Sequence, residues 1–497
     1  MANFDFVSSD TATVYTSPAK EKRIRDLLWG DRVEVLGVSG AMTEVRARSR
    51  ARTGFVDTAA LGGQALLEFY FIDVGQGDGI LIVTPDRRHI LIDGGYPRLK
   101  QNTGKSAADF VDWKFFEDYA SDTIALDAMI CSHNDEDHYG GLTDLLDVAT
   151  AEQRELDCTG ITVEQFFHAG LSWWKDAGGR RVLGDTERVG SSSYFVELLG
   201  DRASAVAGLS GASPKALQGQ WRKFIQAATA ARTAAGDPTP FTRLSQMSGA
   251  LPGFAAGPVS IAVLAPVESP TPAGPGLRKL DTSTSKNTNG HSVLLRVDYG
   301  GSRVLLTGDL NKNSQRVLLE AYSGRETAFL SDVAKSCHHG SEDVSFEFLA
   351  AMKPAITVIS SGDGEGHDHP RPAIVGASGV TGYLTVKDDE ILTPLVYSTE
   401  LARSVSLGDP YKVVSGPAGA TATLDGDAFE ASTIHFRETK PGALNPESKR
   451  RRLGQTYVVA GQIYGLVNVR TDGRRIMSAT MNEGDGSWQI KTILARF

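Results

Sequence analysis

The chain has few cysteines and no hydrophobic run long enough to cross a membrane. Of its 497 residues only three are cysteine, namely Cys131, Cys158 and Cys337. This low number excludes a disulfide-dense scaffold, so we expect buried free thiols and a reducing compartment. A spanning helix needs about 20 apolar residues in a row, and the sequence contains no such run. An integral membrane protein is therefore not expected.

A secretory signal and an excess of positive charge are also missing. Residues 1–5 carry no basic segment leading into an apolar one, so we expect a cytoplasmic protein without a membrane partner. The formal net charge is −9, which argues against a generally basic nucleic-acid-binding surface. Two basic clusters could still follow a phosphate backbone, with a hairpin tip and a solvated linker as the alternatives: Arg46, Arg48, Arg50 and Arg52, and Lys449, Arg450, Arg451 and Arg452.

The composition is typical of a soluble globular protein, with 41% hydrophobic and 22% charged residues. Residues 1–62 alternate short β-forming runs with turns and predict a small all-β domain. Between 66 and 400, continuous apolar strands alternate with helical segments, which favours sheets covered by helices. Residues 173–276 within this part are interpreted as an insertion beside the active site that could form a lid. Residues 401–497 predict a β-rich C-terminal region that ends in a hairpin.

The most informative segment joins a buried strand to four possible metal ligands. The apolar run 128–131 leads into Ser132-His133-Asn134-Asp135-Glu136-Asp137-His138 and then a Gly-Gly pair. Imidazole and carboxylate groups suit zinc and other borderline divalent ions. Two carboxylates between two imidazoles can be divided between two ions, as two-metal hydrolysis requires. A polar turn that caps a helix explains one carboxylate but not all four groups, so we predict a metal site.

This motif, His-x-Asp-x-Asp-His, resembles the His-x-His-x-Asp-His signature of the metallo-β-lactamase fold, with Asp135 in the place of the second His. The Asp form is similar to the hydrolase domain of bacterial DNA-uptake proteins of the ComEC type. The resemblance covers about residues 66–375 and implies an αββα sandwich, in which two sheets lie between helical layers. Four further segments agree in the family order: Phe71-Ile72-Asp73-Val74-Gly75-Gln76-Gly77-Asp78, Leu91-Ile92-Asp93-Gly94-Gly95, Leu305-Leu306-Thr307-Gly308-Asp309 and Lys335-Ser336-Cys337-His338-His339-Gly340-Ser341.

The resemblance implies a site with two divalent ions that lower the pKa of a water held between them and so supply hydroxide. Zinc is expected first, and manganese or magnesium competes because the site is rich in carboxylates. His338 and His339 cannot both face one ion from adjacent strand positions, and we expect His339 to be the ligand. The other ligands are expected to be His133 and Asp135 for one ion, Asp137 and His138 for the second, and Asp309 as a bridge.

Other residues are expected to act around the ions. His369, with His367 as its rival, is expected to donate a proton to the leaving group or to contact substrate, and an exposed loop His is the alternative. We count it with Asp137 and His338 as catalytic. The third ligand of the first ion stays open between His168 and His291, and a satisfied buried His is the alternative for His168. Asp93 is expected to orient a ligating His, while Asp73, Asp78 and Asn289 are candidates for supporting or substrate contacts or for turn capping.

The leading functional hypothesis is hydrolysis of phosphodiester bonds, by a nuclease or nucleotide phosphodiesterase whose substrate could be DNA or a nucleotide. The alternatives are an acyl-bond hydrolase, such as a lactonase or β-lactamase, a phosphocholine-ester hydrolase, and a non-catalytic binding module.

At the N-terminus, two segments resemble bacterial SH3-like domains, with Phe55 where that family usually has Trp: Leu27-Leu28-Trp29-Gly30-Asp31-Arg32-Val33 and Thr53-Gly54-Phe55-Val56. A protein or peptide partner is therefore expected there.

Overall fold

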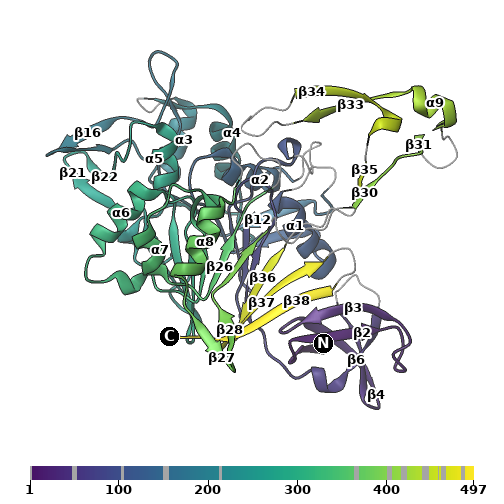
Figure 1. Cartoon of the computed structure of the whole chain (residues 1–497). Coiled ribbons are helices and arrows are strands. Elements are labelled where there is room, and N and C mark those ends of the chain that lie inside the picture. Colours follow the sequence, from purple (N-terminus) through teal and green to yellow (C-terminus); the bar gives the residue numbers. More distant parts are fainter. Residues whose placement is uncertain are drawn as a thin grey trace.

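The computed structural model describes twelve stretches of the chain, which are residues 3–47, 53–101, 106–148, 156–211, 215–362, 369–399, 406–415, 422–438, 447–456, 458–460, 466–482 and 487–497. They form a mixed α/β structure built on two large sheets, with a separate β unit at the N-terminus (Figure 1). Among these residues no helix is long and apolar enough to cross a membrane. The cytoplasmic location stays a prediction.

The first large sheet has nine strands in the order β19-β13-β11-β9-β8-β7-β36-β37-β38. Its strands β9, β11, β13 and β19 run parallel, and the neighbouring pairs from β9 to β38 are antiparallel. The bounds are β7 Leu67–Phe71, β8 Ile80–Val83, β9 His89–Ile92, β11 Ala128–Cys131, β13 Phe166–His168, β19 Phe241–Arg243, β36 Val467–Thr471, β37 Arg475–Asn482 and β38 Ser487–Leu494.

The second large sheet has six strands in the order β20-β23-β24-β25-β26-β29. The pairs from β24 to β29 are parallel, so the ends of β24 and β25 lie at the same edge. The bounds are β20 Val259–Ala265, β23 Leu294–Tyr299, β24 Ser302–Leu306, β25 Val333–Lys335, β26 Ile356–Ile359 and β29 Leu395–Ser398.

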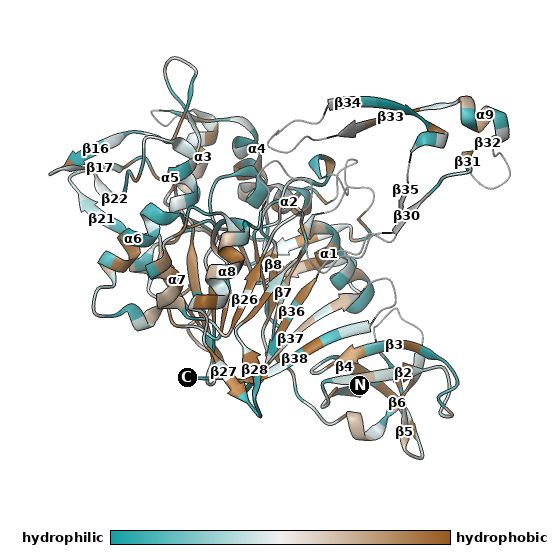
Figure 2. Ribbon diagram, viewed as in Figure 1, coloured by the Kyte–Doolittle hydropathy of each residue, from teal (hydrophilic) through white to brown (hydrophobic). Residues whose placement is uncertain are grey.

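The two sheets pack face to face, and helices cover their outer faces. Side chains along β11 alternate between two hydrophobic cores. Ala128 and Ile130 lie in the core between the sheets, while Met129 and Cys131 face the core under the helices. Hydrophobic residues accordingly concentrate on the strands in Figure 2. The helices over the first sheet are α1 Ala107–Trp113, its π-helical continuation Lys114–Asp118, α2 Glu136–Leu146 and α4 Gly219–Ala230, and those over the second are α6 Lys312–Ala321, α7 Phe346–Met352 and α8 Pro372–Thr381.

Residues 173–276, predicted as an insertion, contain β19 of the first large sheet and β20 of the second as well as smaller elements outside these sheets. This segment also contains the amphipathic helix α4, whose Trp221 and Phe224 are buried against Tyr139 of α2. Its other elements are α3 Arg202–Ser210, β14 Trp174–Lys175, β15 Arg181–Val182, β16 Thr186–Val189, β17 Ser192–Phe195, β18 Ala216–Leu217, β21 Glu268–Thr271 and β22 Gly274–Arg278. α5 (Thr284–Gly290) follows.

The N-terminal unit is all-β, as predicted, and has a hydrophobic core of its own around Val14, Leu27 and Val45. Its strand order, β1-β4-β5-β6-β2-β3, begins and ends at different strands, so the described strands do not confirm an SH3-like closed barrel. The bounds are β1 Phe4–Phe6, β2 Thr11–Tyr15, β3 Arg23–Leu28, β4 Arg32–Ser39, β5 Met42–Arg46 and β6 Thr53–Asp57. Arg48, Arg50 and Arg52 lie outside the described residues.

The C-terminal region divides into two parts. The hairpin β36–β37 forms around residues 472–474 as predicted, but β36 also pairs with β7, so these strands extend the first large sheet instead of forming a third unit. The remainder forms paired strands that reach away from the sandwich (Figure 1). Their bounds are β30 Ser406–Gly408, β31 Lys412–Ser415, β32 Ala422–Asp425, β33 Thr433–Glu438, β34 Glu447–Arg452 and β35 Val458–Ala460, with α9 at Gly426–Ala431.

Candidate metal centre

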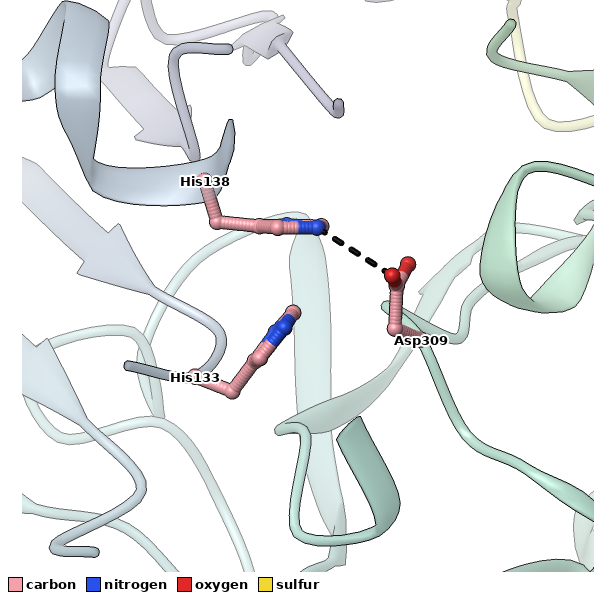
Figure 3. Close-up of side chains that lie close together, drawn as sticks. All are labelled: His133, His138 and Asp309. Carbon is pink, nitrogen blue, oxygen red and sulfur yellow. Dashed lines mark ion pairs between the residues drawn. The ribbon is translucent and has the colours of Figure 1, made fainter. Parts of the chain in front are cut away.

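The predicted ligands meet at one edge of the sandwich, where buried strands of both sheets end. His133 follows β11, and Asp309 follows β24 after the Thr-Gly pair. His339 follows β25 and His138 lies in the first turn of α2. Because parallel strands end at the same edge, segments far apart in sequence deliver their polar residues to one place. The close-up in Figure 3 shows His133 and His138 opposite Asp309.

Three imidazoles and two carboxylates in this cluster have ligand atoms close enough to share ions. His133, His138 and Asp309 form one group and Asp137, His138 and His339 another, with the atoms of each group within 4.8 Å of one another. His138 Nε2 lies 3.3 Å from Asp309 Oδ2 (Figure 3). His339 Nε2 lies 2.9 Å from the same oxygen. The oxygen that faces both imidazoles is placed as a bridging ligand would be.

The donor set fits divalent ions. The Nε2 atoms of His133, His138 and His339 are buried, and within the described part of the chain none has a hydrogen-bond partner of good geometry. Buried polar atoms are normally partnered, and borderline divalent ions take imidazole nitrogen and carboxylate oxygen together. The histidines expected to hold the ions thus have Nε2 atoms available for a metal ion where these atoms converge.

Asp93 holds His138 from behind, as the sequence predicts. Its Oδ2 lies 2.8 Å from His138 Nδ1, and its Oδ1 accepts a hydrogen bond of 2.7 Å from the backbone N–H of Ser132. The carboxylate fixes the imidazole so that Nε2 points at Asp309. The backbone of the next residue, Gly94, lies close to the backbone of α2, because a Cβ at this position would lie 2.6 Å from the backbone nitrogen of Leu142.

The charges of the cluster shift the pKa values of its imidazoles in opposite directions. Burial and the neighbouring His138 hold the pKa of His133 well below its ordinary value. Burial opposes protonation of His138 as well, but Asp309 and Asp93 outweigh it and raise its pKa well above the ordinary value. The same balance, through Asp309 and Asp78, raises the pKa of His339 to about 9. Bound cations would have to displace these protons.

Asp135 and Asp137 stand on either side of the start of α2. Asp135 precedes the helix, accepts a hydrogen bond of 2.8 Å from Thr288 Oγ1, and lies 3.7 Å from His133 Nε2. Asp137 Oδ2 accepts from Gln76 Nε2 at 3.3 Å. Burial and the nearby Asp137 raise the pKa of Asp135 to about 7, so the two acids repel each other unless a cation lies between them. Asp135 belongs to none of the tight groups, and its role as a ligand stays a prediction.

The Gly75-Gln76-Gly77 turn packs directly against these acids. Gly77 has a φ of +117°, and a Cβ there would lie 2.0 Å from the backbone oxygen of Asp137. Only glycine permits both this backbone conformation and this approach.

Both histidines of the late motif face the site, because the backbone turns at them. His338 and His339 have left-handed φ values of 47° and 53°, so the alternation of a strand does not apply. His339 is buried and contacts Asp309, whereas the His338 side chain is 23% exposed and its Nε2 lies 3.9 Å from Asp309 Oδ2. When the Asn289 amide is turned to satisfy its neighbours, its nitrogen donates to Asp135 and its oxygen accepts from His338 Nε2.

His369 lies beside these residues. Its ring centroid is 5.7 Å from that of His338 and 6.4 Å from that of His339. This is compatible with the predicted contact to substrate or leaving group. His367 lies outside the described residues.

The structure does not bring His168 or His291 into the cluster. His168 Nδ1 accepts a hydrogen bond of 3.0 Å from the N–H of Gly170, and burial with the Arg243 charge lowers its pKa to about 3. His291 Nε2 lies 2.9 Å from the backbone oxygen of Arg278, which it can reach as a donor. Neither belongs to a potential ligand group of the described residues. His168 is hydrogen-bonded at Nδ1 but, among the described residues, has no partner at its buried Nε2, so the interpretation as a satisfied buried His holds for one of its two ring nitrogens.

Two residues have a larger part in the site than the sequence suggested. Asp78 belongs to a potential ligand group with Asp309 and His339. Lys335 is fully buried at the end of β25, and its Nζ lies 2.5 Å from Asp78 Oδ2 and 3.5 Å from Asp309 Oδ1. It also donates to the backbone oxygen of Gly308 at 2.9 Å. A lysine ending a buried apolar strand is the signal that could have revealed this pair, since a buried ammonium requires an acid.

Cys131, Cys158 and Cys337 are all free and buried, as predicted.

Comparison with known proteins confirms the predicted resemblance to ComEC-type proteins. No protein-family model matches the chain. A segment of 102 residues is 35% identical to Competence protein ComA of Neisseria gonorrhoeae, and one of 114 residues is 31% identical to ComE operon protein 3 of Bacillus subtilis (strain 168). These segments are 20% and 23% of this chain but only 14% and 12% of the relatives. The similarity therefore concerns a small part of each relative.

A solved structure also aligns with the chain, the metal-dependent hydrolase Tm1679 of the beta-lactamase superfamily. The alignment covers 67% of this chain and 96% of that one, with 12% identity and a TM-score of 0.31. A score this low carries no argument about the fold.

Proposed function

We propose that the protein is a metal-dependent hydrolase of phosphodiester bonds, a nuclease or nucleotide phosphodiesterase, with a metallo-β-lactamase-type αββα sandwich. The observation that carries the proposal is that the buried Nε2 atoms of His133, His138 and His339 converge near Asp309 without a hydrogen bond of good geometry among the described residues. The two sheets packed face to face under helices and the similarity to ComEC-type proteins support it.

The residues that would hold two divalent ions are His133, Asp135, Asp137, His138, Asp309 and His339, with Asp78 as a further carboxylate beside them. Such ions, zinc first and manganese or magnesium as competitors, would polarise the phosphodiester and lower the pKa of water. Lys335 holds Asp78 and sits 3.5 Å from Asp309, and Asp93 fixes the ring of His138.

His338 and His369 are placed to act on the substrate. Burial lowers the pKa of His338 below its ordinary value, so at neutral pH its imidazole is uncharged and can accept a proton or a hydrogen bond. Asn289 orients it. We assign substrate contact to His338 and proton donation to the leaving group to His369.

A polyanionic substrate also has a cationic surface available. β34 carries the second predicted basic cluster, and Arg450, Arg451 and Arg452 are exposed on it. The strand is strongly hydrophilic in Figure 2. Arg46 of the first cluster instead pairs with Glu34 at 2.5 Å, so its charge is already balanced. A protein or peptide partner for the N-terminal unit stays a separate proposal.

A substrate panel with added zinc, manganese or magnesium tests the function. It contains single-stranded DNA, bis-p-nitrophenyl phosphate, a lactone and p-nitrophenyl phosphorylcholine. We expect turnover of the two phosphodiesters that lack choline, abolished in Asp137→Ala while the far-UV circular dichroism stays unchanged.

Turnover of the lactone alone, or of the choline ester alone, would replace the proposed substrate class with that alternative. An unchanged rate in Asp137→Ala would contradict the assignment of this site.

A further inference from the structure

A cavity lies away from the metal centre, between the N-terminal unit and the first large sheet. Its volume is about 550 Å³, within the range of cavities that hold small organic ligands. Phe4 and Arg32 of the N-terminal unit line it on one side, and Arg87, Lys114 and Tyr119 line it on the other. None of the residues with the metal-ligand geometry described above is part of its wall.

Most of the charges around this cavity already have partners. Lys114 Nζ lies 2.5 Å from Asp118 Oδ2 and 3.1 Å from the hydroxyl of Tyr70. Arg470 pairs with Asp31 at 2.7 Å. Three further carboxylates of the wall, Asp26, Glu34 and Asp109, pair with Arg23, Arg46 and Arg98. These charged groups therefore need no ligand to balance them.

Arg32 and Arg87 differ from these charges. Each is only partly exposed and stacks on an aromatic ring, with the Arg32 Cζ 4.2 Å from the Phe4 centroid and the Arg87 Cζ 5.0 Å from the Tyr119 centroid. In the part of the chain that the structure describes, neither guanidinium forms a hydrogen bond or an ion pair with an acid. Both arginines line the same cavity. Burial and the charge of Arg87 lower the pKa of Arg32, against the opposite effect of Tyr119 and Asp118.

We propose that this cavity binds a small organic anion with a planar aromatic body, of the nucleoside monophosphate class, whose phosphate lies between Arg32 and Arg87. Guanidinium groups bind phosphate through paired, charge-assisted hydrogen bonds. The cavity is too large for a single phosphate group, and the aromatic side chains of its wall can stack on a flat ring. The further aromatic residues of the wall include Phe110, Trp113 and Trp488.

Titration calorimetry on the full chain tests the site, with a chelator present so that the metal centre does not contribute. The probes are adenosine 5′-monophosphate, adenosine and inorganic phosphate. We expect the nucleotide to bind, and adenosine and phosphate to bind at least about tenfold more weakly, because each makes only part of the contacts.

The variants Arg32→Gln and Arg87→Gln keep much of the side-chain volume, and each should weaken nucleotide binding about tenfold or more. Arg316→Ala is the matched control, because Arg316 is exposed on α6 away from the cavity wall, and its affinity should equal that of the wild type. Among the described residues neither cavity arginine pairs with an acid, so both variants should fold, as far-UV circular dichroism would show.

Three outcomes would overturn the proposal. The wild type does not bind the nucleotide; the double variant Arg32→Gln/Arg87→Gln binds it as tightly as the wild type; or binding is lost in Asp137→Ala and kept in the arginine variants. Phosphate binding as tight as that of the nucleotide would overturn the role given to the aromatic wall. All of these readouts are independent of hydrolysis, so they do not depend on the proposed function.

Discussion

The metal centre and the junction with the N-terminal unit both bury charged and polar groups, but they satisfy them differently. At the junction, Arg470 has Asp31 at 2.7 Å and also donates to the backbone oxygen of Trp29 at 2.7 Å. At the metal centre, the buried Nε2 atoms of His133, His138 and His339 converge without partners of good geometry. Arg470 and the three imidazoles are buried, whereas the Asp31 side chain is 27% exposed.

The difference indicates what each region is for. A buried ion pair with fixed partners holds two parts of a chain in one arrangement, and removing one partner leaves an unpaired buried charge. Buried atoms without partners weaken the fold unless something else satisfies them. The first region should therefore respond to mutation mainly in stability, and the second mainly in metal binding and activity.

The largest expected effect is that of His133→Ala on hydrolysis. Loss of one ligand should lower kcat/KM by at least about a thousandfold, or ~4 kcal/mol of transition-state stabilisation, while the metal-free protein stays folded. Rates on bis-p-nitrophenyl phosphate measure the effect. His168→Ala is the matched control, since that histidine is equally buried but outside the ligand groups, and its folded fraction should keep wild-type activity. Equal losses of activity in both variants would contradict the assignment of His133, and not His168, to the metal site.

Arg470→Ala should show the opposite pattern. It removes one partner of a buried pair and should lower the free energy of unfolding by about 3–5 kcal/mol, with little change in the activity of the folded fraction. Denaturant titration monitored by tryptophan fluorescence reports the loss. Arg475→Ala on the next strand, with a side chain 41% exposed and its acid 4.0 Å away, should change stability by no more than about 0.5 kcal/mol. A similar response of both arginines would show that the buried pair does not hold the junction.

Asp93→Asn should have a smaller effect, confined to the metal centre. The variant keeps the shape of the side chain but weakens its hold on His138, so metal affinity should fall about 10- to 100-fold. Competition with a fluorescent zinc chelator measures the affinity. An affinity equal to that of the wild type would mean that the 2.8 Å contact between Asp93 and His138 does not support metal binding.

The smallest expected effect is the pH dependence of the junction. Burial alone would raise the pKa of Asp31, but the charges of Arg470 and Lys114 hold it below its ordinary value. A carboxyl whose folded pKa is lowered contributes stability above its ordinary pKa and loses it as pH falls through the folded one. The stability difference between the wild type and Asp31→Asn should thus be largest near pH 7 and shrink below about pH 4. A difference that grows toward acid pH would contradict this sign.

The sequence predicts the local part of this arrangement well. Apolar runs followed by Asp93, His133 and Asp309 indicate strand ends with polar groups, and parallel strands bring such ends together. The contact from Asp93 to His138 and the apolar strands of both large sheets follow from the same reasoning.

Contacts that depend on the path of the chain could not be predicted. Whether Lys335 reaches Asp78 depends on how the end of β25 and the segment between β7 and β8, which are far apart in sequence, meet at the edge of the sandwich. The left-handed backbone at His338 and His339 turns both residues inward, which strand alternation does not anticipate. β36 pairs with β7 across almost the whole length of the chain, and local sequence carries no signal for that choice of neighbour.

Metal analysis of the purified chain is the most direct test of the central claim, that the buried Nε2 atoms of His133, His138 and His339 hold divalent ions. After equilibration with zinc or manganese and removal of free metal, inductively coupled plasma mass spectrometry should find close to two ions per wild-type chain, with a clear loss in a His133→Ala/His138→Ala variant. A wild-type chain that retains no metal, or a double variant that retains the same amount, would contradict the account.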